Sequence, residues 1–345
     1  MSTTTLPQVG PGPNQTSSNP LYGRKYQLLV TTPSLTVSGG SQIIDFSDSA
    51  FEPEALRIVF DVYTPCIHSA YWYADIDIYN LNQTATEQLV LASNNIAQGS
   101  QVTLSAGYGG NGNYGVIWQG PVFQALLTRE NVVDLKLTLH CILSMESALS
   151  NNFISAQYSS GISQSELILQ MLNSIGLHAD YVSPNLSQTK LSRGMTVFGT
   201  PDKYFTQIAE SQNMVWFLSQ RGFSIGKLND GLNSGTTPGF VYSPTTGLLG
   251  TPEQTQAGVN FSVCLDPRLQ AKIPLQTVGI SQALIQQYKK QIGEVIYPLD
   301  QDGTYVVGAV RHRGDSRGNI WQTNITGYVA IGDVLTLLAN NANIN

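Results

Sequence analysis

The sequence predicts a mainly β fold with an inserted α/β module, and two observations lead to this prediction. From residue 22 to 150, and again after residue 257, short runs rich in β-branched and aromatic residues alternate with Gly, Pro and Asn, as strands of a barrel or sandwich do. Between these blocks, residues 151–229 space their apolar residues as helices do. The 345 residues leave room for two or three domains and a large core.

The first β domain is predicted over residues 22–150. Its strand-like runs are, in chain order, YQLLVT, LTVSG, QIIDFS, LRIVFDVY, YWYADIDIYNL, QLVLAS, QVTLSAGY, GVIWQGPVFQALLT and VVDLKLTLHCILS. Residues 1–21 consist mainly of Thr, Ser, Asn, Gln, Pro and Gly, a composition that buries too little apolar surface to offset chain entropy. We therefore expect a flexible N-terminal arm ahead of this domain.

The α/β module at residues 151–229 contains the clearest helix signals. Ser163 and Glu166 form a capping box, and Gly176 stands where a left-handed residue ends a helix. A second helix is expected where Thr200 can cap and Pro201 fits the first helical position. The runs MVWFLS and GFSIGKL then predict two strands.

The rest of the chain is predicted as a linker, a second β domain and a tail. Residues 230–257 are rich in Gly, Asn, Ser, Thr and Pro and are interpreted as the linker. The second β domain covers residues 258–335, and residues 336–345 form a C-terminal tail. Within this domain, Thr304–His312 and Asn319–Tyr328 are expected to be the arms of one hairpin with RGDSRG at its tip.

The charge pattern argues against a nucleic-acid grip and for a surface covered by partners. Charged residues make up only 12% of the chain, about half the usual share, and the net charge is -6. Residues 22–150 carry 11 acidic against 5 basic residues, so an extended basic footprint for phosphates is absent there. A surface with so little charge suits a subunit of an assembly better than a free monomer.

Two carboxylates are the strongest candidates for chemistry. Asp75 and Asp77 alternate with Ile76 and Ile78 along one predicted strand, so both carboxylates project from one face, roughly 6–7 Å apart. Glycosidases use paired carboxylates at such separations. An ordinary strand with one solvent-exposed face produces the same alternation, and we favour this structural interpretation over catalysis.

Other motifs carry no cofactor or metal chemistry. Gly107, Gly109 and Gly112 satisfy GxGxxG, but the chain continues as a strand and not as the helix a dinucleotide requires, which favours a glycine-rich turn. The four histidines fall in separate segments, and no nucleophile motif is present. Three distant cysteines indicate buried free thiols, and no apolar run is long enough to span a membrane. We therefore expect no enzyme, no cofactor and no membrane span.

Three stretches resemble the trimeric baseplate hub proteins of contractile-tailed bacteriophages, which are related to the hub part of type VI secretion spike proteins. They are VTLSAGYGGNGNYGVIWQGPVFQALLTREN from Val102, LLGTPEQTQAGVNFSVCLDPRLQAKIPLQT from Leu248, and GTYVVGAVRHRGDSRGNIWQTNITGY from Gly303. The order and spacing of the three stretches, together with the capped helix, extend the resemblance over about residues 24–330. The N-terminal arm lies outside it.

The resemblance implies a structural role in a virion, with the protein made in the host bacterial cytoplasm. In the family, two barrels like those of the tail-tube protein occur in each subunit, and three subunits form a ring that joins the sixfold tail tube to the threefold central spike. The implied partners are two further copies, the tail tube protein, the central spike protein and surrounding baseplate proteins such as the wedge, with tape measure contact also open. Genomic DNA would pass through without sequence-specific binding.

Two sets of residues receive roles in this reading. A ring that passes DNA should avoid a basic lumen, so Asp75 and Asp77 are candidates for the channel wall. The hairpin residues Arg311, Arg313, Asp315 and Arg317 are candidates for contact with another subunit or a baseplate partner. Within the tip, Gly314 and Gly318 would allow the turn, and Asp315 would accept hydrogen bonds from turn N–H groups or pair with a neighbouring arginine.

Alternatives remain open at this point. The chain could instead be a tail-tube, distal-tail or tail-terminator ring protein, or a glycan-binding or glycan-cleaving tail protein that uses the Asp75 and Asp77 pair. For the Arg-Gly-Asp triplet, a cell-adhesion motif and a nucleic-acid clamp around His312 are less favoured than a hairpin tip, because Asp315 interrupts the basic residues.

Overall fold

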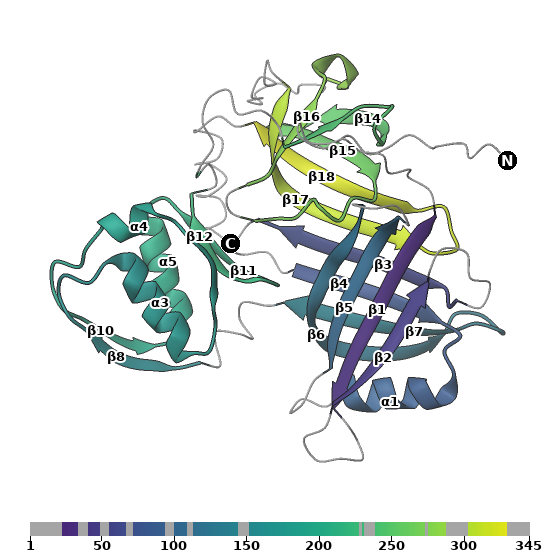
Figure 1. Cartoon of the computed structure of the whole chain (residues 1–345), viewed down its shortest axis with the longest axis horizontal. Helices are drawn as coiled ribbons and strands as arrows, with labels where there is room; N and C mark the ends of the chain where they lie inside the picture. Colours follow the sequence, from purple (N-terminus) through teal and green to yellow (C-terminus); the bar gives the residue numbers. More distant parts are fainter. Residues whose placement is uncertain are drawn as a thin grey trace.

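The computed structural model describes residues 23–33, 41–48, 55–66, 72–93, 100–108, 113–143, 152–227, 230, 239–272, 275–287 and 303–329. The expected N-terminal arm and C-terminal tail lie outside these residues. The chain forms two β lobes joined by one sheet, with a helix-containing module beside them (Figure 1). The prediction of a mainly β fold with an inserted α/β module is therefore confirmed.

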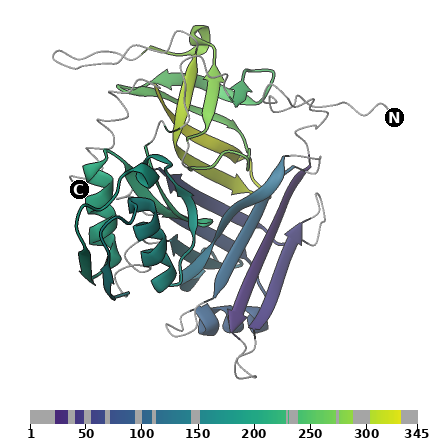
Figure 2. The same cartoon turned by 60° about the vertical axis from the view of Figure 1, so that its left-hand side comes forward.

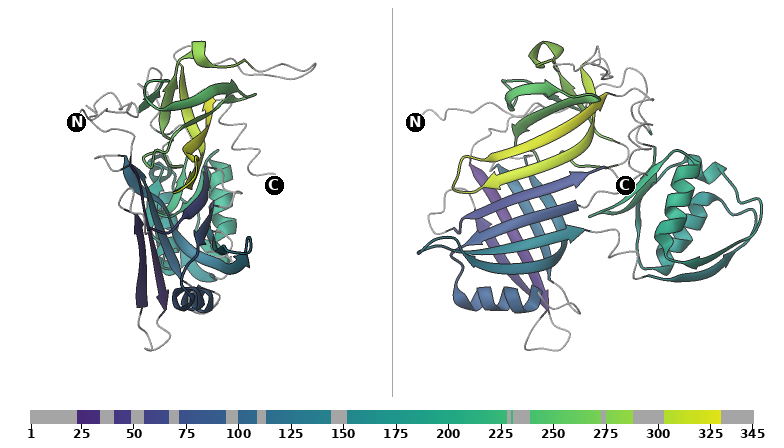
Figure 3. Two further views of the ribbon diagram at one scale, coloured as in Figure 1. Left: turned by 90° about the vertical axis from the view of Figure 1, so that its right-hand side faces the viewer. Right: turned by 180° about the vertical axis from the view of Figure 1, so that it is seen from behind.

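One antiparallel sheet passes through both lobes. Its strands are, from one edge to the other, β14 (Leu248–Gln254), β15 (Gly258–Cys264), β18 (Trp321–Val329), β17 (Thr304–Asp315), β3 (Ile58–Pro65), β4 (Trp72–Tyr79), β7 (Leu135–Leu143), β6 (Tyr114–Arg129), β5 (Gln101–Tyr108), β1 (Arg24–Pro33) and β2 (Ser41–Asp48). The strands from β18 to β7 lie side by side in the rear view (Figure 3). The C-terminal hairpin thereby becomes part of the same wall as the N-terminal strands.

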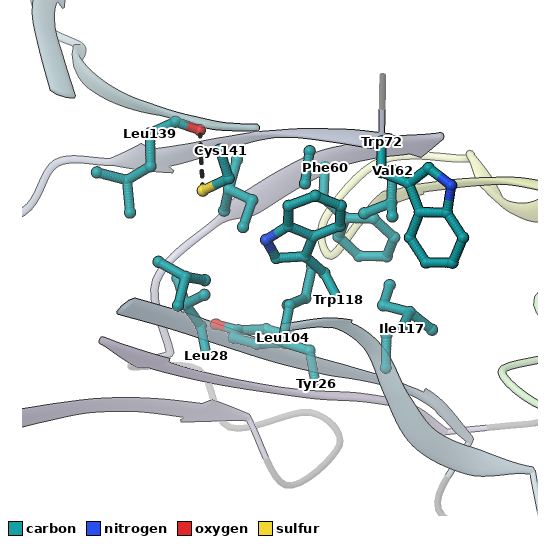
Figure 4. Close-up of a cluster of buried hydrophobic side chains, with 14 of the residues drawn as sticks. Tyr26, Leu28, Phe60, Val62, Trp72, Leu104, Ile117, Trp118, Leu139 and Cys141 are labelled. Carbon is teal, nitrogen blue, oxygen red and sulfur yellow. Dashed lines mark hydrogen bonds between the residues drawn. The ribbon is translucent and has the colours of Figure 1, made fainter. Parts of the chain in front are cut away.

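Strand β6 closes the first lobe by passing from one layer to the other. Its first half, Tyr114–Pro121, pairs with β5, whereas Val122–Arg129 pairs with β7, and the register shifts between Val122 and Gln124. Such a bulge bends a strand at the corner of a barrel. Between the two layers, the fully buried Trp118 is surrounded by side chains such as Leu28, Phe60, Leu104 and Leu139 (Figure 4).

The run QLVLAS is helical, and the expectation of a strand there was wrong. It belongs to α1 (Gln83–Ser93), which packs against β6. The Asn82 side chain accepts a hydrogen bond from the Ala85 backbone amide at 2.8 Å, as an N-cap residue does, and Gln83 Nε2 donates to the Glu87 carboxylate one turn later. Leu89 is fully buried, so the helix contributes to closing the lobe.

The α/β module has its own core of buried apolar residues (Figure 2). Its elements are β8 (Ile154–Tyr158), α3 (Gln164–Ser174), β9 (Ala179–Val182), α4 (Asn185–Gln188), β10 (Met195–Gly199), α5 (Pro201–Ser211), β11 (Val215–Ser219) and β12 (Gly222–Gly226). The capping box of Ser163 and Glu166 is present, and Gly176 has φ 73°, so both predictions for α3 are confirmed. Pro201 begins α5 as predicted, but the Thr200 side chain makes no capping bond.

Strand β11 fastens the module to the first lobe, because its two faces belong to two cores. Val215 and Phe217 pack into the first lobe, where Phe217 stacks on Trp72 with ring centroids 6.0 Å apart. Trp216 and Leu218 pack into the module. This explains why the run VWFLS is buried along its whole length.

The second lobe includes strands inside the segment predicted as a linker. β13 (Phe240–Tyr242) pairs with β16 (Thr277–Ile280), and β14 pairs with β15. Beyond the short helix η1 (Gln282–Leu284), Gln286 bridges to Glu253 of β14, which closes the strands around a second-lobe core. The composition of 230–257 concealed these strands because Gly, Thr and Pro occur within β14 itself.

The two arms of the C-terminal hairpin are present as predicted, but the turn begins later. β17 extends to Asp315, and the Asp315 amide donates to the Ile320 carbonyl at 2.8 Å, so the turn comprises residues 316–320. Arg313 and Gly314 pair with residues of β18 inside the ladder. Gly314 is required by close packing, because a Cβ there would lie 2.3 Å from the Phe60 ring.

All three cysteines are free thiols, as the sequence predicts. Cys66 and Cys141 are buried, whereas Cys264 is only partly so. Burial raises the pKa of Cys66 to about 12, which keeps this thiol protonated and unreactive at neutral pH.

The two helix starts of the module give a matched test of capping. Ser163→Ala removes a side-chain bond to the Glu166 amide and should lower the free energy of unfolding by about 1 kcal/mol. Thr200→Ala removes no such bond and should change it by less than about 0.5 kcal/mol. Urea denaturation of both variants measures the difference, and equal losses would contradict the assignment.

Candidate functional site

The outward face of the central sheet is the candidate site, because it gathers most of the charged residues that the sequence singled out. Along β3 and β4 every second residue is buried, and Ile76 and Ile78 of β4 are fully inside. Asp75 and Asp77 therefore share the outward face, as the alternation predicts. The face continues across the β3–β17 pairing into the second lobe.

Each of the two β4 carboxylates has a partner on the neighbouring strand β7. Asp75 Oδ1 lies 2.6 Å from His140 Nδ1. Asp77 accepts a hydrogen bond from Thr138 Oγ1 at 2.6 Å and forms an ion pair with Lys136 Nζ at 3.5 Å. The register places His140 directly opposite Asp75 and Thr138 directly opposite Asp77, whereas Lys136 lies two residues further along β7, opposite Tyr79. Both carboxylates are thus held in cross-strand contacts.

Arg311 and Arg313 lie on the face inside β17, and not in the turn. Arg311 binds Asp61 of β3 with two hydrogen bonds, Nε to Oδ1 at 2.7 Å and Nη2 to Oδ2 at 2.5 Å. Arg313 Nε lies 3.6 Å from the same carboxylate. The hydrogen bonds to Asp61 raise the pKa of Arg311 above its usual value. One aspartate therefore contacts two cations at the junction of the lobes.

The turn itself is bound to the first lobe by arginines. Asp315 accepts from the Arg317 amide at 3.0 Å and from Arg57 at 3.2 and 2.7 Å, as predicted for this carboxylate. Burial acts to raise the pKa of Asp315, but the bonds to Arg57 and Arg317 outweigh it and lower the pKa. Arg24 of β1 donates to the carbonyls of Asp315 and Gly318. The Arg317 guanidinium donates to the Ala55 carbonyl at 2.7 Å.

The positive and negative charges on this face balance. The cations Arg57, Lys136, Arg311 and Arg313 each contact one of the carboxylates Asp61, Asp77 and Asp315, while Asp75 pairs with His140. The sequence analysis did not identify Asp61, Arg57 or His140 as residues of this face. The alternation in LRIVFDVY could have placed Asp61 on the outward face, but it could not have identified the arginines that bind Asp61.

His312 points away from the face and cannot clamp a nucleic acid, because its side chain is only 2% exposed. Its Nδ1 lies 2.9 Å from Thr323 Oγ1, and this hydroxyl oxygen accepts a hydrogen bond from the backbone amide of Asp266. Asp266 in turn binds Arg268 and the Tyr242 hydroxyl. Burial lowers the pKa of His312 to about 4, although Asp266 acts in the opposite direction.

Other motifs give the site no further chemistry. A strand, β6, follows the glycines of the GxGxxG pattern, as expected, but Gly107 lies within β5 and not in a turn, while Gly109 and Gly112 lie outside the described residues. In the described part of the chain, no three His, Cys, Asp or Glu side chains cluster as metal ligands. None of the described helices is long and apolar enough to cross a membrane.

The comparisons show which known structures share this fold. No protein-family model matches the sequence, and no curated protein does. The 43 kDa tail protein of prophage MuSo2 from Shewanella oneidensis matches with a TM-score of 0.52 at 9% identity, over 90% of this chain and 98% of that one. A tail protein from Neisseria meningitidis MC58 matches with a TM-score of 0.52 at 12% identity, over 92% and 99%.

A third structure is a complex that contains VgrG. The Francisella PdpA–VgrG complex, in a half-lidded form, matches with a TM-score of 0.50 at 9% identity, over 89% of this chain and 58% of the other. At such identities the likeness is one of fold. The chain thus has the fold of phage tail proteins and of the VgrG type, which confirms the expected resemblance.

Acidification tests the buried position of His312. Between its unfolded pKa near 6.5 and its folded pKa of about 4, the unfolded chain binds a proton that the folded chain does not, so stability falls as the pH falls. This group alone should remove about 2 kcal/mol between pH 7 and pH 5. Denaturant midpoints at both pH values measure the loss. His312→Gln should lack this component, and an unchanged pH dependence in the variant would refute the assignment.

Proposed function

We propose that this chain is a structural subunit of a phage tail baseplate. In finer detail, three copies form the central hub, a ring between the sixfold tail tube and the threefold spike that lets DNA pass and performs no catalysis. The observation that carries the proposal is the continuous sheet whose outward face crosses both lobes with its cations paired. Fold likeness to tail proteins and to VgrG supports it. The other partners proposed are surrounding baseplate proteins, including the wedge, and the tape measure protein.

The sheet topology supports assembly of several copies. From β14 to β6 the central sheet has an even number of strands that alternate in direction, so its two end strands run in opposite directions. A second copy placed head-to-tail would therefore continue the antiparallel order. Among the described strands, only β7 pairs with the second half of β6, and Leu248 and Leu249 of β14 pair with β15 alone.

The balanced charges support passage of DNA. An arginine that is free to meet a phosphate adds affinity by releasing counterions, whereas one bound to a carboxylate on its own sheet contributes much less. On the outward face, Arg311, Arg313 and Lys136 are bound to Asp61 and Asp77. We place this face, including Asp75 and Asp77, on the channel wall. DNA would then slide past a surface that does not hold it.

The oligomeric state and the position in the tail test the proposal. Light scattering of the full chain, alone and mixed with the spike protein of the same tail, should show a species with the mass of three chains. A six-chain ring would instead favour the distal-tail alternative, and a monomer under both conditions would contradict the ring. In an imaged tail, the chain should lie on the axis between tube and spike.

Unpairing the cations should create DNA affinity. Asp61→Asn combined with Asp77→Asn leaves Arg311, Arg313 and Lys136 without their carboxylates. We expect binding of double-stranded DNA at low salt, with a log–log salt slope of roughly -3 if all three meet phosphates. Asp180→Asn, which removes the carboxylate partner of Arg221 in the module, is the matched control and, like the wild type, should not bind DNA. Equal binding by wild type and double variant would argue against the DNA part of the proposal.

A further inference from the structure

The turn between β6 and β7 displays two valines to solvent. Val132 is 87% exposed and Val133 is 82% exposed, the highest values of any large apolar side chain in the described ranges. The turn projects beyond the end of the sheet (Figure 3). An isolated chain gains no stability from such a pair, and exposed apolar groups that adjoin one another mark contact sites.

The same turn is held rigid by hydrogen bonds that do not involve the valine side chains. Asn131 Oδ1 accepts the amides of Val133 and Asp134 at 2.8 and 2.7 Å. Asn80 and Asn131 donate to the Asp134 carboxylate at 2.9 and 2.7 Å, and these two bonds lower its pKa. A loop that is ordered before binding loses little conformational entropy when it docks. The valines are thus presented in a fixed position.

The exposed apolar surface continues from the turn along the second half of β6. Phe123, Leu126 and Leu127 are 70%, 38% and 49% exposed. In this half, β6 pairs with β7 on one side and with none of the described strands on the other. Helix α1 also packs against β6. The valine turn therefore stands at the end of an apolar stretch of β6 that has a pairing partner on one side only among the described strands.

The opposite end of the sheet carries a pocket of about 520 Å³. β14 loses its pairing with β15 between Leu249 and Glu253, and Gly250 and Thr251 line one side of the pocket. Its lining also includes Tyr63 and the polar side chain of Asn324. The volume is ample for two valine side chains. Arg311, which also lines the pocket, is bound to Asp61, whereas Glu253 in the lining carries a charge opposite to that of Arg129 beside the valine turn.

We propose that Val132 and Val133 of one copy dock into the β14 pocket of the next copy. In a head-to-tail arrangement, the antiparallel order places the C-terminal end of β6 against the N-terminal end of β14. The turn that follows Arg129 then meets the side of the pocket that Leu249 and Gly250 line. This inference rests on the proposed ring and names the surfaces that join its subunits.

Removing the valines tests the contact. Val132→Ser with Val133→Ser should weaken trimer formation at least 10-fold in light scattering across a dilution series, while the melting temperature of the monomer stays unchanged. Ile43→Ser is the matched control, because Ile43 is 65% exposed but lies on β2 in the other layer. A double variant that assembles as tightly as the control would overturn the docking.

A disulfide across the proposed contact gives a second, direct readout. Val133→Cys combined with Thr251→Cys should give dimers and trimers linked between chains under oxidation, whereas each single variant should not. The native Cys66 and Cys141 are buried, and any cross-linking through the partly buried Cys264 would also occur in the single variants. A trimeric double variant that fails to cross-link would refute this contact but leave the ring intact. A wild-type chain that is monomeric under every condition, including with the spike protein, would refute the ring itself.

Discussion

The pairing of β17 with β3 is the interaction on which the rest of the structure depends. It joins Arg311 to Asp61, which lie 250 residues apart in the sequence, and makes one sheet out of two lobes. Without this ladder, the polar face would end at each lobe, and the sheet would not continue from β14 to β6. The fit is tight as well as hydrogen bonded, since Phe60 of β3 packs edge-on against Trp321 at 5.3 Å and leaves no room for a side chain at Gly314.

The ion pairs along this junction connect the two lobes and also set the charge of the outward face. Asp61 holds Arg311 and Arg313, and Asp315 holds Arg57, so the ion pairs that span the two lobes also reduce the positive charge of the face. Ion pairs this exposed contribute little to stability individually. Their larger consequence is electrostatic, because a wall with balanced charge neither attracts nor strongly repels a polyanion. This is consistent with a passage for DNA.

The α/β module is packed into the hydrophobic core of the first lobe, whereas the valine turn and the second half of β6 expose apolar side chains to solvent. β11 shares its side chains between two hydrophobic cores, so the module is attached by buried packing in addition to its covalent connections. The valine turn and the second half of β6 instead leave apolar groups in water, although the turn is firmly hydrogen bonded. In a chain with so few charges, surface of this kind is best explained by contact with other chains.

The sequence by itself determined the features that depend on near neighbours: the mainly β class, the capping box of α3, the shared face of Asp75 and Asp77, and the two arms of the last hairpin. Periodicity and capping are local, so one segment carries the whole signal. Local patterns gave wrong predictions in two situations. The run QLVLAS fits a strand as well as the helix that it forms, and Gly and Pro within β14 made this strand resemble a linker. Only the tertiary structure decided that β17 pairs with β3, that Arg311 meets Asp61 and that His312 turns inward. Those outcomes depend on register and packing between distant segments, about which a single segment carries no information.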